Sequence, residues 1–457
     1  MTETINIREL AAQVLLLAER GEQKGKEALQ EMLLKYQYLP KQERAFLSRL
    51  VGGVIEYQLR LDYILNQFSN TPMNKCKPYI RCVLRLSAYQ IVFLSGVPVS
   101  AACNEAVKLV KKHGFLRLSG FVNGVLRTLA REQDSIVYPD EQENPVSYLS
   151  VMYSLPEWLV KLFMEQYGYE TAKCMAKASV ASVPLTVRFQ QSVLSVEQAG
   201  QCMKEEGLLL SPIETNSAME QLLGEKLIKE LRHSAVYMEQ VDYLSRYESF
   251  QNGYFTMQDV SSMLPGLLLE QMRTSQKKEG VFQVLDMCAA PGGKSCHIAD
   301  LSSDYRVCSR DVSLSKTERI RENVSRLKLS NVIVEEQDAC VFTKELAHAM
   351  DAVLLDAPCS GFGVLGRKKE IAYNMTPQGI EDLIMLQRDM LNVACRYLKK
   401  DGILLYSTCT VNQRENSSNV SWFLEEHKEY ELVKQYQLLP GVMPLDGFYV
   451  AVLLKRS

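Results

Sequence analysis

The sequence predicts a multidomain protein with an all-α N-terminal domain, a small α+β connecting module and a C-terminal α/β domain built on a parallel sheet. Its 457 residues are 47% hydrophobic and 23% charged, enough chain for about three domains. Apolar residues recur at helical spacing up to about residue 131, whereas short apolar strands alternate with helices after Gly253. Such alternation is typical of a doubly wound parallel sheet.

The N-terminal domain, residues 1–135, is expected to be helical throughout. Leu10, Val14, Leu17 and Ala18 show the three- and four-residue spacing of an amphipathic helix. Gly96-Val97-Pro98 and His113-Gly114 act as stop signals between later helices. The further helices are expected at residues 45–68, 79–94, 101–113 and 120–131.

An acidic, proline-containing segment without periodicity, residues 136–147, is interpreted as a linker. Residues 148–250 are predicted to form the connecting α+β subdomain, because two helix patterns flank one strand pattern. These are Pro156 to Tyr167, Val196 to Glu206 and the strand from Leu185 to Phe189. In the catalytic domain, residues 251–457, strands are predicted at 281–287, 305–309, 332–336, 352–356 and 403–407.

Positive charge is concentrated in the helical domain, although the whole chain has a net charge of −2. Residues 1–135 carry 19 Lys and Arg against 12 Asp and Glu, a net charge of +7. Residues 75–131 carry ten basic residues and one acidic residue, Glu105. A solvated helical surface would show more interspersed acids, so we predict contacts with a nucleic-acid backbone. The candidate residues are Lys108, Lys111, Lys112, Arg117 and Arg127.

Other classes of protein fit the sequence poorly. No apolar stretch approaches the about 20 residues of a bilayer span, and MTETINIREL lacks the features of a secretory signal. A cytoplasmic location is therefore expected, with the twelve cysteines as free thiols. Because no Cys-x-x-Cys pair occurs and the histidines do not cluster with cysteines, we expect no metal site.

In an open parallel sheet, ligands bind beyond the carboxyl ends of the strands. The first strand runs into a loop of small residues that lets a ligand approach the backbone closely. The GGKS that ends this loop resembles a phosphate-binding motif, but Cys288 stands where that motif needs its first glycine. A nucleoside triphosphate site is the weaker interpretation. The loop is Cys288, Ala289, Ala290, Pro291, Gly292, Gly293 and Lys294.

Aspartates follow the next two strands. Asp311, after the second strand, is placed to accept hydrogen bonds from ribose hydroxyls, and Asp338, after the third, from an adenine amino group. Each alone is as well explained as a helix N-cap. Together with Asp286 after the first strand, they outline a pocket for an adenosine without phosphates. S-adenosyl-L-methionine fits that description.

Two cysteines also leave strand ends. Cys359 follows the fourth strand, and Cys409 follows the next strand that can be assigned. A free cysteine is usually a small buried hydrophobe, but these two are expected to face the pocket. A thiolate that adds to C6 of a pyrimidine activates C5 toward a sulfonium methyl donor. The pattern therefore indicates C5 methylation of a pyrimidine.

The blocks LDMCAAPGGKS, LLDAPCSGFGVLGR, YSTCTVNQREN and DGFYVAVLLK resemble those of bacterial RNA (cytosine-5)-methyltransferases of the Sun/Fmu, or RsmB, type. The helical domain resembles the NusB-like RNA-binding domain fused to these enzymes, through ERAFLSRLVGGVIEYQLRLD, IRCVLRLSAYQIVFLSGVP, NEAVKLVKKHG and GFVNGVLR. The resemblance covers nearly the whole chain. It implies a Rossmann-like, S-adenosyl-L-methionine-dependent methyltransferase domain.

The resemblance also implies residue roles. Cys409 would attack cytosine C6, and Cys359 would assist release of the methylated product. Asp356 would bind the cytosine edge at N3 and N4, while Lys294 would lie near the cofactor and the base. Cofactor contacts are implied for residues 288–294, Asp311, Asp338 and Asp356. The implied substrate is 16S ribosomal RNA, at the cytosine of position 967.

Two stretches depart from the family pattern. Residues 366–373, GRKKEIAY, replace the usual Arg-Arg-His-Pro-Asp-Ile-Lys-Trp, so positive charge is kept while the His-Pro pair and the Trp are lost. Residues 187–190, VRFQ, stand where Arg-Val-Asn is customary, and the retained Arg188 is an expected RNA contact. Both departures bear on which cytosine is chosen rather than on the reaction.

Two alternatives remain open at this point. One is C5 methylation of a different rRNA or tRNA cytosine. The other is a non-catalytic RNA chaperone, which the retained cysteines and pocket aspartates argue against. We expect a cytoplasmic, monomeric enzyme with RNA as its partner and neither a metal nor a membrane.

Overall fold

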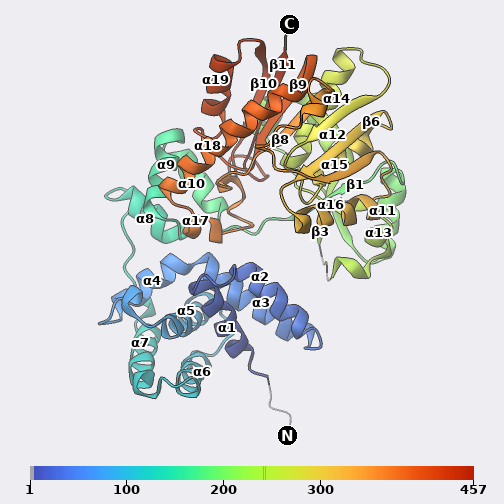
Figure 1. Cartoon of the computed structure of the whole chain (residues 1–457). Helices are drawn as coiled ribbons and strands as arrows, with labels where there is room; N and C mark the ends of the chain where they lie inside the picture. Colours follow the sequence, from blue (N-terminus) through green and yellow to red (C-terminus); the bar gives the residue numbers. More distant parts are fainter. Residues whose placement is uncertain (1–4, 240, 242, 457) are drawn as a thin grey trace. The chain divides into compact units, whose positions relative to one another are not determined.

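The computed structural model describes residues 5–239, 241 and 243–456 (Figure 1). It divides into a helical unit, residues up to 180 together with 368–374, and a catalytic unit, residues 181–367 together with the chain from 375 onward. Within the described ranges, no helix is long and apolar enough to cross a membrane, and no three metal-ligating side chains gather at one point.

The helical unit is built around α5, whose residues are almost all buried and which packs against α1, α3, α4, α6 and α7. The apolar residues that predicted α1 and the later helices form one continuous core. The helices are α1 (Ile7–Glu19), α2 (Gly25–Lys35), α3 (Lys41–Glu56), α4 (Gln58–Gln67), α5 (Pro78–Phe93), α6 (Val99–Lys112), α7 (Ser119–Arg131), α8 (Pro145–Tyr153), α9 (Glu157–Tyr167), α10 (Tyr169–Ala178) and α17 (Glu370–Asn374).

The helical unit differs from the sequence expectation in two ways. The single helix expected over residues 45–68 is two helices, α3 and α4, which meet at Tyr57 with a non-helical ψ of 21°. Helices α8 to α10 pack with the helical unit rather than with a connecting module that begins at residue 148. The Ser154 hydroxyl explains part of this packing, because it accepts a hydrogen bond from Leu59 N (2.8 Å) in the first turn of α4.

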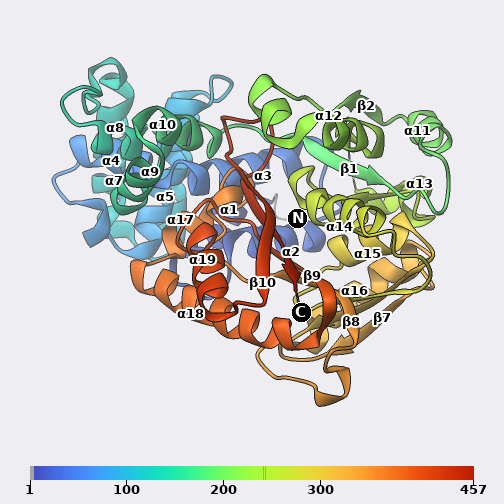
Figure 2. The same ribbon diagram turned by 90° about the horizontal axis from the view of Figure 1, so that it is seen from above.

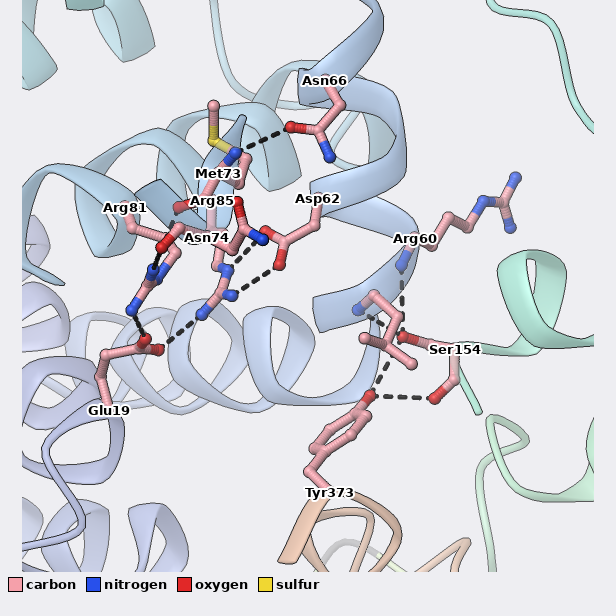
Figure 3. A network of polar contacts seen from close by, with 11 residues as sticks. Glu19, Arg60, Asp62, Asn66, Met73, Asn74, Arg81, Arg85, Ser154 and Tyr373 are labelled. Carbon is pink, nitrogen blue, oxygen red and sulfur yellow. Dashed lines mark hydrogen bonds and ion pairs between the residues drawn. The ribbon is translucent and has the colours of Figure 1, made fainter. Parts of the chain in front are cut away.

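Residues 368–374 belong to the helical unit although both flanking segments belong to the catalytic unit. The hydroxyl of Tyr373 on α17 lies 3.0 Å from both the Oγ and the carbonyl oxygen of Ser154 (Figure 3). Lys369 Nζ donates to the carbonyl of Tyr153 and to Ser179 Oγ, both at 2.7 Å. Most of the stretch that departs from the family pattern, residues 368–373, therefore belongs to the helical unit, where Lys369 and Ala372 are buried.

In the described part of the catalytic unit, a seven-stranded sheet has the order β10-β11-β9-β8-β5-β6-β7. Strands β9, β8, β5, β6 and β7 are mutually parallel, which confirms the predicted doubly wound fold. Strands β10 and β11, which the sequence did not predict, extend it in antiparallel fashion. The strands are β5 (Phe282–Asp286), β6 (Tyr305–Asp311), β7 (Val332–Glu336), β8 (Met350–Asp356), β9 (Leu398–Thr408), β10 (Tyr430–Leu438) and β11 (Phe448–Lys455).

Both faces of this sheet are covered by helices, as Figure 2 shows. Alternate strand residues enter two separate cores, because successive side chains of a strand point to opposite faces. One core takes in α14 (Leu264–Ser275) and α15 (Gly293–Leu301), and the other takes in α18 (Pro377–Ala394) and α19 (Ser417–Glu426). Helix α16 (Leu314–Arg326) packs against β6 and β7.

A smaller antiparallel sheet, of order β2-β3-β1-β4, belongs to the same unit. Its strand β1 coincides with the predicted strand from Leu185 to Phe189. The α+β part of the expected module is therefore confirmed in kind, but it packs with the catalytic unit. Its elements are β1 (Leu185–Phe189), β2 (Leu209–Pro212), β3 (Ala235–Glu239), β4 (Phe255–Met257), α11 (Val196–Glu205), α12 (Ser217–Ser234) and α13 (Glu248–Gln251).

Candidate active site

The parallel strands bring the predicted site residues to one edge of the large sheet. Asp356, the last residue of β8, pairs in register with Ser407 near the end of β9. Asp286, the last residue of β5, pairs with Leu354 of β8 and with Ser309 of β6. The loops that follow these strands therefore leave the sheet side by side.

The two strand-end cysteines are in contact. Cys359 Sγ lies 3.3 Å from Cys409 Sγ, although the residues are 50 positions apart in the chain. Their hydrogen bond, then burial, and then the charges of Cys409 and Glu415 raise the pKa of Cys359 well above its usual value. The raised pKa favours the protonated form of Cys359, whose thiol can share a hydrogen bond with Cys409.

Lys294, in the first turn of α15, supplies positive charge beside Cys409. Burial opposes the charge of Lys294, but the Asp356 carboxylate and then Cys409 raise its pKa above the usual value. The same attraction favours the ionised form of the thiol, since an opposite charge nearby stabilises a thiolate. Of the two cysteines, Cys409 is thus the one that interacts with a cation.

Asp356 is held from both sides. Lys294 Nζ donates to its Oδ2 and Ser407 Oγ donates to its Oδ1, each at 2.7 Å. The side chain keeps partial exposure. An oriented, accessible carboxylate next to two cysteines can accept hydrogen bonds from an exocyclic amino group.

The small-residue loop after β5 is fixed against β6. Ala289 N donates to the carbonyl of Arg310 (2.8 Å), and Ala290 N donates to Asp311 Oδ2 (2.9 Å). Gly292 has φ +100°, and a Cβ there would approach the Ile320 side chain to 3.2 Å. The loop needs glycine at this position, so the sequence Cys288 to Gly293 presents its backbone at the carboxyl edge of the sheet.

The predicted cofactor carboxylates differ in exposure. Asp311 is buried and also accepts from Val312 N (2.8 Å) and from Lys316 Nζ (2.9 Å), whereas Asp338 is exposed and accepts from Cys340 N (2.8 Å). A ribose would share Asp311 with Lys316, whose side chain is 51% exposed and free to turn toward solvent.

Asp286 adds a further acceptor beneath the loop. It is fully buried, and Ser295 Oγ donates to its Oδ2 (2.6 Å). Among the described residues, nothing donates to its Oδ1. Burial raises the pKa of Asp286 to about 7. An unused buried oxygen, a glycine-dependent loop and two strand-end aspartates form a set of groups that fits an adenosine-containing cofactor without phosphates.

The predicted RNA-contacting residues of the helical unit lie on the exposed faces of α6 and α7 and on the turn between them. Lys108, Lys111 and Arg127 line a shallow surface pocket. Lys108 also pairs with Glu105 (2.7 Å), and Lys112 pairs with Glu9 (2.8 Å). Arg117, in the turn between the two helices, is exposed.

Arg188 is a correction to the sequence expectation. Its side chain is 1% exposed and donates to Asp300 Oδ2 (2.7 Å) and to Gln258 Oε1 (2.9 Å). A guanidinium enclosed in this way joins β1 to α15 and has no surface to offer RNA. The arginine of the VRFQ stretch is therefore a structural residue.

One site residue escaped the sequence analysis. Glu415, in the loop between β9 and α19, accepts hydrogen bonds from the backbone and side chain of Ser360, the residue after Cys359. The short YSTCTVNQREN block contains it, but a glutamate six residues after a cysteine carries no recognisable spacing. The contact spans 55 positions of chain and appears only in the fold.

Comparison with known proteins agrees with these features. The family model described as 16S rRNA methyltransferase RsmB/F matches residues 273–454, and the NusB family model matches residues 5–131. A probable ribosomal RNA small subunit methyltransferase B of Bacillus subtilis is 33% identical, over 99% of each chain. The corresponding Synechocystis protein is 31% identical, over 99% of this chain and 100% of its own.

Solved structures support the fold. The crystal structure of PH0851 has a TM-score of 0.79 at 20% identity and covers 99% of both chains. The structure of NSun6 from Pyrococcus horikoshii with SFG has a TM-score of 0.53 at 23% identity, over 66% of this chain and 98% of that one. The predicted fold class and the family resemblance are both confirmed.

Proposed function

Since the chain belongs to the RsmB/F family of 16S rRNA methyltransferases, we propose that it methylates carbon 5 of a cytosine in 16S rRNA, the base of position 967. Family membership already makes it an RNA methyltransferase that uses S-adenosyl-L-methionine. The observation that carries the finer proposal is the contact between Cys359 and Cys409 beside Lys294 and Asp356. This set supplies a thiolate, a second thiol and an oriented carboxylate at one point.

The reaction begins with a base that has left its stack, because C5 and C6 are otherwise covered by neighbouring bases. Cys409 Sγ adds to C6, and the electron pair of the C5–C6 double bond makes C5 nucleophilic. When bound, the cofactor supplies an electrophilic methyl group for C5. Asp356, fixed by Lys294 and Ser407, holds the base by accepting hydrogen bonds from its N4 amino group and from N3 when that nitrogen carries a proton.

Release needs a base that takes the C5 proton. The electrons of the C5–H bond then restore the C5–C6 double bond, and Cys409 leaves as a thiolate. We assign this assistance to Cys359, because its Sγ is in contact with the attacking sulfur. A thiol with a raised pKa starts the cycle protonated, so Cys359 first loses its proton to solvent water and then takes the C5 proton as a thiolate.

The remaining groups bind the two substrates. Asp311 is assigned to the ribose and Asp338 to the adenine of the cofactor, with residues 288–293 as the backbone wall. The basic side chains of α6 and α7 are assigned to the RNA backbone. The proposal also includes a monomeric state and a cytoplasmic location. The free thiols support the location, because disulfides are rare in a reducing compartment.

The proposal is tested by mapping 5-methylcytosine in a strain that lacks this gene. Bisulfite sequencing of its ribosomal RNA should show one cytosine that has become unprotected, and the wild-type gene should restore it. A gene encoding Cys409→Ala should express equally and restore nothing. Loss of 5-methylcytosine in transfer RNA alone would contradict the ribosomal substrate, and no loss in any RNA would contradict C5 methylation.

A further inference from the structure

Glu415 is a fully buried carboxylate at the reacting edge of the sheet. Within the described chain, its Oε1 accepts from Ser360 N (2.8 Å) and Gln387 Nε2 (3.1 Å). Its Oε2 accepts from Ser360 Oγ (2.5 Å) and Asn412 Nδ2 (3.0 Å). Burial of a charge is costly unless its oxygens are satisfied, and here both oxygens are used fully.

These donors belong to the two loops that carry the cysteines. Ser360 directly follows Cys359, and its hydroxyl lies 2.7 Å from that of Thr410, which directly follows Cys409. Asn412 N donates to Thr410 Oγ1 (3.2 Å) and so extends the chain of hydrogen bonds through the second loop. The carboxylate of Glu415 is thus the common end point of hydrogen bonds from both loops.

Gln387 on α18 links the other side of the first loop. Its Nε2 donates to the carbonyl of Pro358 (2.9 Å) as well as to Glu415. Cys359 is therefore fixed through the residue before it and the residue after it. A shift of this loop would change the Sγ–Sγ contact, which has to persist for one thiol to hydrogen bond to the other.

The electrostatics around the two cysteines are unequal. The four donors named above are all neutral, so these hydrogen bonds do not pair the charge of Glu415 with a cation. The charged group that also interacts with Glu415 is Arg414, the residue before it. The charge of Glu415 contributes to the raised pKa of Cys359, after the hydrogen bond to Cys409, burial and the charge of Cys409. Lys294 interacts instead with Cys409. One thiol faces an anion and the other a cation.

We propose that Glu415 is a positioning residue that keeps Cys359 as a protonated thiol in contact with Cys409, so that Cys409 alone attacks the base. The inference rests on the proposed function, because the arrangement matters only if Cys409 attacks the base. The protonation of Cys359 itself can be measured without the reaction. Glu415 need not touch RNA or cofactor. It acts through Ser360 and through its charge.

The first test measures this thiol without RNA. In a Cys409→Ala background, the rate of Cys359 alkylation by iodoacetamide is followed against pH, with the modified peptide resolved by mass spectrometry. Glu415→Gln removes the charge and keeps the size, so the midpoint of the profile should move to lower pH. Glu220→Gln, which removes a surface carboxylate paired with Arg232, serves as the matched control and should leave the midpoint unchanged.

The second test separates the charge from the hydrogen bonds. Ser360→Ala removes one hydroxyl that links Glu415 to the second loop but leaves the carboxylate in place. In single-turnover methylation by the full chain, both Glu415→Gln and Ser360→Ala should lower the rate at least tenfold while cofactor affinity stays within twofold. Only Glu415→Gln should also move the alkylation midpoint.

Each outcome bears on the inference. An unchanged midpoint in a folded Glu415→Gln variant, or a wild-type methylation rate in Ser360→Ala, would overturn it. If Glu415→Gln does not fold, Ser360→Ala alone still decides the positioning role. Failure of wild-type protein to form 5-methylcytosine would instead reject the proposed function, and the alkylation profile would remain a valid measure of Glu415.

Discussion

Two buried carboxylate clusters, one in each unit, are built on opposite principles. In the helical unit, the Asp62 carboxylate on α4 accepts hydrogen bonds from Arg85 Nε (2.7 Å) and Nη2 (2.6 Å) (Figure 3). The Glu19 carboxylate on α1 accepts from Arg85 Nη1 (2.7 Å) and also from Arg81. In the catalytic unit, Glu415 receives neutral donors. The first cluster pairs its carboxylates with arginines, whereas the second holds the buried charge of Glu415 with neutral donors.

This difference in charge pairing indicates a structural role for the Arg85 cluster and an electrostatic role for Glu415. Paired charges cancel at a distance, so the Arg85 cluster exerts little field and mainly joins α1, α4 and α5. Burial opposes the charge of Arg85, but the hydrogen bonds and charges of Asp62 and Glu19 raise its pKa, which keeps it cationic. An anion held by neutral dipoles keeps its field, which acts on nearby titratable groups, here Cys359, Tyr406 and Arg414. We therefore expect substitutions in the first cluster to change stability and those in the second to change chemistry.

The largest effect is expected from the two cysteines themselves. Cys409→Ala should abolish both methylation and any covalent RNA adduct, because no other group at the site is placed to add to C6. Cys359→Ala should still attack and methylate but release the product slowly. The trapped complex should appear as a band of lower mobility in denaturing electrophoresis that nuclease treatment removes.

Both cysteine variants should keep the wild-type unfolding midpoint, in line with a cluster that serves chemistry. A trapped band with Cys409→Ala rather than Cys359→Ala would reverse the two roles. A band with neither variant would leave Cys359 as a packing residue.

The next effect tests the paired cluster. Arg85→Met should destabilise the helical unit by about 3–5 kcal/mol, because it leaves Asp62 and Glu19 buried without their main partner. Urea unfolding measures this change. Methylation per folded molecule should stay near the wild-type value, and Lys108→Met, at an exposed surface pair, should cost less than about 1 kcal/mol. A catalytic defect in folded Arg85→Met would break the comparison.

The sequence predicted the parallel strands closely, for reasons that the sheet makes clear. Central strands such as β5 and β8 are mostly buried and read as short apolar runs. The predicted bounds also match β7, a partly exposed edge strand, and β1 of the smaller antiparallel sheet, because both carry β-branched residues. Strand β10 was missed because it mixes exposed polar and apolar residues at the edge of the sheet. The break at Tyr57 was missed because the apolar spacing continues across it.

For the candidate site, the rule that functional residues follow parallel strands picked out both cysteines, Asp356 and the small-residue loop, which the fold brings to one edge of the sheet. It could not find Glu415, whose partners Ser360 and Gln387 lie 55 and 28 positions away and share no period with it. It also placed Arg188 on the RNA surface, since sequence does not distinguish an exposed arginine from one buried against Asp300. Long-range polar contacts thus mark the limit of prediction.

Lys369 sharpens the comparison, because it is a buried amine whose hydrogen bonds go to neutral acceptors within the helical unit. Burial lowers its pKa to about 7. Between this pH and the pKa of lysine in the unfolded chain, about 10.4, the unfolded chain binds a proton at Lys369 that the folded chain does not. Stability should therefore fall as pH drops from 10 to 7, by about 1.4 kcal/mol per pH unit relative to Lys369→Met.

Below pH 7 both states are protonated, so the difference between wild type and Lys369→Met should level off. Chemical denaturation of the two proteins at several pH values measures it. Equal pH dependence in both proteins would mean that Lys369 stays charged in the fold.

A smaller effect is expected at the cofactor. Asp311→Ala should weaken S-adenosyl-L-methionine binding more than tenfold in calorimetry, because hydrogen bonds to a charged group contribute about 1.5–3 kcal/mol each. Lys316→Ala is the matched control, since it removes the exposed cation that shares this carboxylate. It should leave binding unchanged or tighten it. An unchanged affinity in Asp311→Ala would exclude this residue from the cofactor site.

The smallest effects per residue are expected on the basic face of α6 and α7, where charges are exposed rather than buried. The triple variant Lys108→Ala, Lys111→Ala and Arg127→Ala removes the cations that line one surface pocket. Each lost phosphate contact should flatten the slope of log K for RNA against log salt by about 0.7–0.9. Lys112→Ala should change the slope less, because it removes at most one phosphate contact, at a lysine that also pairs with Glu9. Fluorescence titrations at four salt concentrations distinguish the two variants. A slope that the triple variant leaves intact would assign these side chains to solvent, and RNA affinity would then have to originate elsewhere on the chain.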